Sequence, residues 1–121
     1  MYKRQAQPGQ PNILAQNQDL PTYLDGTQIV LEVEDRENDV RIIMPSIAGF
    51  IGLHGMNDKG IGNCVNTLAQ LSCRTSGPLS TFVIRAMLSC HTFDEAVNLV
   101  QTSGHTAVSY THLTLPTTRL V

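Results

Sequence analysis

The stretch from His54 to Leu68, HGMNDKGIGNCVNTL, concentrates residue types that could do chemistry: three glycines, three asparagines and a cysteine. Glycine-rich turns bind phosphate where they open a helix, and an activated cysteine can act as a nucleophile. The phosphate interpretation is disfavoured, because Gly60-Ile61-Gly62 lacks the third glycine of GxGxxG and leads into the strand-like CVNTL. The stretch therefore predicts a sharp turn at residues 57–60 that leads into a strand.

The cysteines and histidines do not have the spacing of a metal or redox site. The cysteines are Cys64, Cys73 and Cys90, and the histidines are His54, His91, His105 and His112. We expect no metal ion and no cofactor, and we interpret the cysteines as buried thiols. Self-cleavage between Asn63 and Cys64 would expose a new N-terminal cysteine, but a position inside a strand without a nearby base disfavours it.

Strands must position these residues. TQIVLEVED, residues 27–35, alternates apolar and polar side chains and predicts a strand, and DRENDV predicts a turn into a second, β-branched strand interrupted by Pro45 and Gly49. NILAQNQDLP predicts a short strand that ends before Pro21. Asp19 lies at the end of that strand, where a side chain could face a site.

Two helices follow the strands. Pro78 suits the first turn of a helix whose apolar face is predicted as Leu79, Phe82, Val83, Ala86, Met87 and Cys90. Thr92 and Glu95 have the spacing of a capping box, and a second apolar stripe, Phe93, Ala96, Val97 and Val100, precedes Gly104. Strands followed by helices predict an α+β domain, with two helices on one face of a mostly antiparallel sheet.

Charge and composition exclude some partners. All ten acidic residues lie between Asp19 and Glu95, so we expect no nucleic acid partner, and no apolar run is long enough to predict a membrane partner. The ends, MYKRQ and residues 107–121, resemble translated adapter sequence and are predicted to be non-native. The predicted domain therefore spans residues 6–106.

Three segments together resemble a known family: residues 13–21, 49–68 and 76–100. In order and spacing they are similar to the acyl-CoA:isopenicillin-N acyltransferase-like proteins (peptidase C45) and the wider choloylglycine hydrolase group, which are N-terminal-nucleophile hydrolases. The most specific part is G-x-N-x-x-G-x-x-x-x-x-N, present as Gly55, Asn57, Gly60 and Asn66. The resemblance implies part of a four-layer αββα fold, completed by the remainder of its own domain.

The resemblance also implies catalytic roles. The family nucleophile is an N-terminal cysteine ahead of the QNxD strand, and because residues 1–15 contain no cysteine, we expect this chain itself to be inactive. Asp19 matches the aspartate that orients the cysteine and its α-amine. Asn66 closes the glycine motif, and the backbone N–H of Thr67 stands where the family has an oxyanion-hole donor. Gln16 replaces the arginine of the bile-salt-type members, which favours the acyltransferase-like branch.

The expected function is therefore that of a hydrolase or acyltransferase fragment, whose parent acts on linear amide or thioester bonds through an acyl-enzyme. A small-molecule amide or an acyl-CoA is the expected substrate. The alternative is a non-catalytic binding or structural module on the same scaffold. A Gly-Cys-Thr or Met-Cys-Thr directly upstream of QPGQPNILAQNQD in the gene would favour the enzyme.

Overall fold

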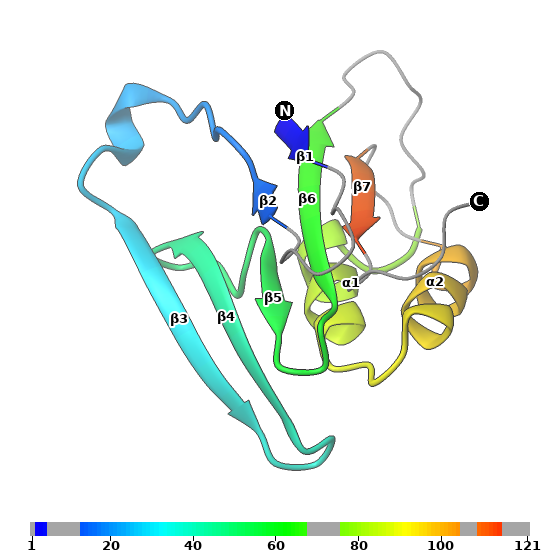
Figure 1. Ribbon diagram of the computed structural model, residues 1–121. Helices are drawn as coiled ribbons and strands as arrows, with labels where there is room; N and C mark the ends of the chain where they lie inside the picture. Colours follow the sequence, from blue (N-terminus) through cyan, green and yellow to red (C-terminus); the bar gives the residue numbers. More distant parts are fainter. Residues whose placement is uncertain (1, 5–12, 68–75, 105–108, 115–121) are drawn as a thin grey trace.

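The computed structural model describes residues 2–4, 13–67, 76–104 and 109–114 (Figure 1). Its elements, in chain order, are β1 (Tyr2–Arg4), β2 (Ile13–Ala15), a 3-10 turn η1 (Thr22–Leu24), β3 (Gln28–Asp35), β4 (Val40–Ile47), β5 (Gly55–Asn57), β6 (Gly62–Thr67), α1 (Ser80–Leu88), α2 (Phe93–Thr102) and β7 (Ser109–Thr114). Strands β3-β4-β5-β6-β7 form one antiparallel sheet in that order, and β1 pairs with β2 in a second. The predicted α+β class is confirmed.

The hairpin of β3 and β4 pairs along the full length of both strands. The predicted interruption at Pro45 is wrong, because β4 continues to Ile47. The N–H of Ala48 donates to the carbonyl oxygen of Thr27 at 2.9 Å, so even-numbered residues of β4 turn their backbone groups toward β3. The nitrogen of Pro45 therefore faces the other side, where β5 pairs only with residues 42–43, and no ladder bond is lost.

Helix α1 packs against one face of the sheet (Figure 1). The core formed by the sheet, α1 and α2 is apolar and consists of Val40, Ile42, Met44, Ile61, Ile84, Met87, Leu88 and Ala96. A Cβ on Gly55 would lie 3.2 Å from the Leu88 side chain and 2.5 Å from the carbonyl oxygen of Ile43. The absence of a side chain at Gly55 is thus what lets α1 approach β5.

The predicted apolar face of α1 is wrong in part. The helix begins at Ser80, after Pro78, and its buried residues are Val83, Ile84, Met87 and Leu88. Leu79 and Phe82 are 59% and 54% exposed. Because most residues of this helix are apolar, its stripe is wider than the area of contact with the sheet, and periodicity alone cannot choose between neighbouring faces.

The second sheet lies on the side of β6 away from the helices. Gly62 pairs with Met56, the neighbour of Gly55, so the two glycines face opposite sides of the sheet. A Cβ on Gly62 would lie 3.2 Å from the side chain of Leu14 in β2. The layers are therefore helices, five-stranded sheet and two-stranded sheet, which is compatible with part of an αββα fold.

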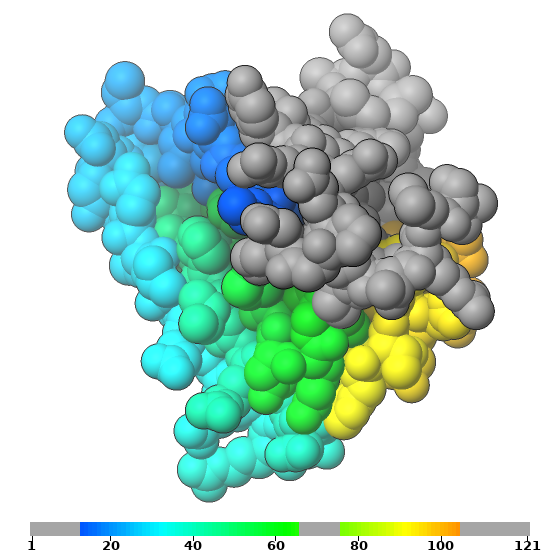
Figure 2. Space-filling view, viewed as in Figure 1, coloured from blue at the N-terminus to red at the C-terminus, as the bar shows by residue number. Residues whose placement is uncertain are grey.

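Part of that outer face is uncovered. Val30, Ile43 and Met56, on β3, β4 and β5, are 70%, 49% and 51% exposed. Figure 2 shows the β3–β4 hairpin open to solvent along one side of the molecule.

The two end segments contribute β1 and β7. All six residues of β7 pair with β6. An open sheet edge accepts an added strand through main-chain hydrogen bonds, whatever the origin of that strand. The non-native origin of residues 1–5 and 107–121 therefore stays a prediction.

Candidate active site

The site begins at an edge of β6. Strand β5 begins at Gly55, whose partner is Asn63, so β5 gives no partner to the residues of β6 that follow Asn63. The N–H of Asn57 donates to the carbonyl oxygen of Ile61 at 2.8 Å, and the N–H of Val65 donates to the side chain of Gln16 at 2.9 Å. Odd-numbered residues of β6 therefore turn their backbone groups toward the β5 side.

Asn66 and Thr67, the two site residues predicted on β6, turn their backbone groups in opposite directions. The backbone of Asn66 turns toward β7, where it pairs with Tyr110, whereas the N–H of Thr67 turns toward the edge that β5 has left. An N–H outside the strand ladder can bind an oxyanion. The N–H of Thr67 thus faces this edge and that of Asn66 does not. The catalytic roles of both residues stay predictions, and their side chains lie outside the described part of the structure.

Gln16 connects the N-terminal segment to the same edge. Its Nε2 donates to the carbonyl oxygen of Val65, and its Oε1 accepts the Val65 N–H. Asp19 lies three residues beyond Gln16, between β2 and η1, and is exposed. Among the described residues, no hydrogen bond or ion pair joins Asp19 to another side chain. The structure therefore brings the segment that carries Asp19 to β6, but it does not pair its carboxylate with a described group.

The predicted turn at residues 57–60 is confirmed. Gly60 has φ +86°, which glycine adopts without strain. Asn57 does not use the left-handed region; its side chain organises the turn instead, because its Oδ1 accepts the N–H groups of Lys59 and Ile61 at 3.1 and 2.8 Å.

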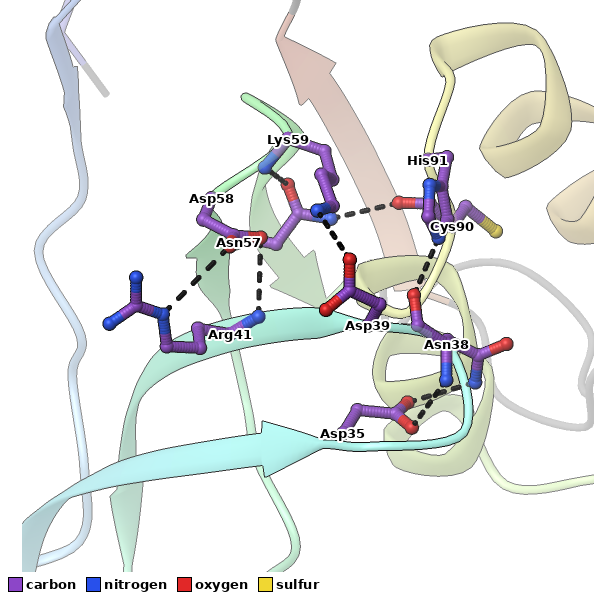
Figure 3. A network of polar contacts seen from close by, with 9 residues as sticks. All are labelled: Asp35, Asn38, Asp39, Arg41, Asn57, Asp58, Lys59, Cys90 and His91. Atoms are coloured by element: carbon purple, nitrogen blue, oxygen red, sulfur yellow. Dashed lines mark hydrogen bonds and ion pairs between the residues drawn. The ribbon is translucent and has the colours of Figure 1, made fainter.

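Asn57 also binds the helical layer, a role that sequence reasoning missed. Its Nδ2 donates to the carbonyl oxygens of Leu88 and Cys90, both at 2.9 Å, so each hydrogen-bonding position of the amide is used. Figure 3 shows Asn57 between the β5–β6 turn and the α1–α2 connection. The only sequence signal was its place in the glycine motif.

The same connection meets the tip of the β3–β4 hairpin (Figure 3). The Nε2 of His91 lies 2.5 Å from the carbonyl oxygen of Asn38. A hydrogen bond from the side chain of Ser89 lowers the pKa of Asp35, and a hydrogen bond from the side chain of Asn38 adds a smaller effect in the same direction. The capping box predicted at Thr92 and Glu95 is confirmed, and it begins α2 directly after this contact.

Two cysteines are described: Cys64, whose backbone partner in β7 is His112, and Cys90, which follows α1. Cys64 is buried, 2% exposed, inside β6. Burial raises the pKa of Cys90, and the charge of Glu95 raises it further, while burial lowers the pKa of His54.

Within the described ranges no three His, Cys, Asp or Glu side chains lie together as metal ligands, and no helix is long and apolar enough to cross a bilayer. Cys73 and His105 fall outside those ranges.

Glu95→Gln should make the free energy of unfolding fall less steeply as the pH is lowered into the acid range. A hydrogen bond from the backbone N–H of His91, followed in size by one from the N–H of Thr92, lowers the pKa of Glu95 from its ordinary value of 4.5. The capping box therefore contributes fully above pH 4.5 and loses its contribution as the pH falls through the lower pKa of the folded state. Glutamine keeps an acceptor but does not titrate, so the variant should lack this acid-dependent loss.

Chemical denaturation as a function of pH measures this effect. Asp94→Asn is the matched control, because it removes a charge from the same first turn without touching the capping box. Equal slopes for the wild type and Glu95→Gln on the acid side would contradict the prediction.

A comparison with known families identifies the family to which the chain is similar. The family model described as Acyl-coenzyme A:6-aminopenicillanic acid acyl-transferase matches residues 6–116, a range that contains Asp19, Asn66 and Thr67. A comparison with curated proteins found no significant match, and a comparison with solved structures found none either.

Proposed function

Because the chain belongs to the acyl-coenzyme A:6-aminopenicillanic acid acyl-transferase family, we propose that it is part of a cysteine N-terminal-nucleophile enzyme. The parent enzyme cleaves a linear amide or a thioester and passes the acyl group to water or to an amine. The observation that carries the proposal is the backbone of Thr67, whose N–H faces an edge of β6 that β5 does not reach, beside the segment tethered by Gln16.

In this mechanism a cysteine thiolate attacks the carbonyl carbon, after its proton has passed to the α-amino group of the same residue. The N–H of Thr67 stabilises the oxyanion that develops, an interaction that contributes roughly 3 kcal/mol where such donors are preorganised. The leaving amine or thiol takes the proton, and water or an acceptor amine then releases the acyl group.

Asp19 orients the nucleophilic cysteine and its amine. Its exposure supports that role, because a carboxylate without a hydrogen bond or ion pair to the described residues can accept one from a group ahead of Gln16. Asn66 closes the turn motif next to the oxyanion donor.

A non-catalytic module on the same scaffold is the second candidate. Such a module would keep the scaffold without a cysteine ahead of the QNQD segment, residues 16–19. A gene whose complete reading frame lacks a cysteine at that place would favour the module over the enzyme.

The 121-residue chain should therefore show no turnover of chromogenic amides, penicillins or acyl-CoA thioesters. The same assays on a protein extended upstream to a cysteine should show activity. Cys64→Ser is the control for the internal cysteine, which the buried position of Cys64 makes a poor nucleophile. Turnover by the 121-residue chain that disappears in Cys64→Ser would contradict the proposal.

A further inference from the structure

The side chain of Gln16 pairs with both backbone groups of Val65, a residue 49 positions further along the chain. Its Nε2 donates to the carbonyl oxygen of Val65, and its Oε1 accepts the N–H at 2.9 Å. An amide side chain has a donor and an acceptor side by side, in the arrangement of a peptide group. Gln16 thus pairs with Val65 as a residue of a neighbouring strand would.

The position of this pairing on β6 matters. Strand β5 pairs with β6 as far as Asn63, and the next residues that face the same edge are Val65 and Thr67. The amide of Gln16 already bonds the N–H and the carbonyl oxygen of Val65, so it cannot also bond the backbone of Thr67. We call this pair of hydrogen bonds between Gln16 and Val65 the tether. It extends the paired edge of β6 by one residue and stops just before Thr67, the predicted oxyanion donor.

The tether also limits the position of Asp19. Because Asp19 follows Gln16 by three residues, their Cα atoms are at most about 11 Å apart. Thr67 follows Val65 by two residues of an extended strand, a Cα separation of about 7 Å. The pair of hydrogen bonds between Gln16 and Val65 is thus a short link between the carboxylate and the oxyanion donor.

We infer that Gln16 is a positioning residue of the reaction. It fixes the segment of Asp19 against β6 and leaves the N–H of Thr67 as the donor for the substrate oxyanion. The inference rests on the proposed function and deepens it, since it assigns the geometry of the site to a side chain that does not touch the substrate.

Hydrogen exchange of the Val65 amide tests the tether without reference to activity. In the 121-residue chain, Gln16→Ala should reduce the protection of this amide by about tenfold, because two hydrogen bonds are lost. Gln18→Ala is the matched control, since Gln18 is exposed on the same segment, and it should leave protection unchanged.

Gln16→Glu gives a second measurement if the alanine variant folds poorly. An ionised carboxylate has no donor for the carbonyl oxygen of Val65, whereas a protonated carboxyl group has both a donor and an acceptor. The protection factor of Val65 should therefore fall at neutral pH and recover below about pH 4, near the ordinary pKa of glutamate. Wild-type protection in both variants at neutral pH would overturn the tether.

Kinetics on the protein extended to its cysteine test the positioning role. Gln16→Ala should lower the acylation kcat by about a hundredfold with little change in KM, because misplaced reacting groups lose rate more than affinity. A residue with only a structural role would change the melting temperature and leave kcat at its wild-type value in the folded fraction, and that result would overturn the inference. Absence of acylation in the wild type would overturn the proposed function, and with it the positioning role, while the exchange measurement would still decide the tether.

Discussion

Asn57→Asp should destabilise the folded chain by about 3 kcal/mol or more, although it replaces one nitrogen atom by oxygen. The amide is buried, 7% exposed, and its Nδ2 donates to the carbonyl oxygens of Leu88 and Cys90. A carboxylate would present a charged acceptor to these two acceptors, and a protonated carboxyl group could donate to only one of them. Both forms therefore lose at least one buried hydrogen bond.

The loss of stability should affect the contact between the α1–α2 connection and the sheet, and not only the β5–β6 turn. The turn keeps its acceptor in the variant, because an aspartate oxygen can still receive the N–H groups of Lys59 and Ile61. The α1–α2 connection, in contrast, loses the donor that holds it to the sheet. The backbone amides of α1 and α2 should thus lose their protection from hydrogen exchange before those of the β3–β4 hairpin.

Chemical denaturation at neutral pH measures the change in free energy of unfolding. Asn98→Asp is the matched control, since Asn98 is exposed on α2 and its substitution should alter stability by less than about 0.5 kcal/mol. Equal unfolding midpoints for Asn57→Asp and Asn98→Asp would show that the contact in Figure 3 does not hold the helices to the sheet.

Local features of the fold were predictable from the sequence. The alternation of β3, the turn before Gly60 and the capping box at Thr92 each depend on residues a few positions apart, so a single sequence shows them. The continuation of β4 through Pro45 was not predictable, because it depends on which side of the strand β5 occupies.

The contacts that position the site depend on distant residues. Asn57 binds carbonyl groups 31 and 33 positions away, and Gln16 binds a residue 49 positions away. The buried face of α1 was also decided by a distant group, since Leu88 packs where Gly55 leaves room. Sequence reasoning found the residues of the motif, but the structure was needed to show which backbone group of β6 is turned toward the open edge.

Asp19→Asn, in the protein extended upstream to its cysteine, should lower the acylation kcat by at least about a hundredfold. The substitution keeps the size of the side chain and removes the charge that, in the proposed mechanism, orients the cysteine and its α-amine. Because Asp19 is exposed and has no partner among the described residues, the melting temperature should hardly change. If maturation requires self-cleavage, unprocessed precursor should accumulate as well.

Pre-steady-state acylation with a chromogenic amide, run beside thermal melting, separates a catalytic role for Asp19 from a structural one. Asp25→Asn is the matched control, because Asp25 is an exposed aspartate on the same segment, at the end of η1, and should retain wild-type acylation. A purely structural aspartate would lower stability and leave the rate of the folded enzyme intact. Rapid acylation by a well-folded Asp19→Asn enzyme would mean that the carboxylate orients nothing in the reaction, and the tether at Gln16 would then position a segment without a catalytic group.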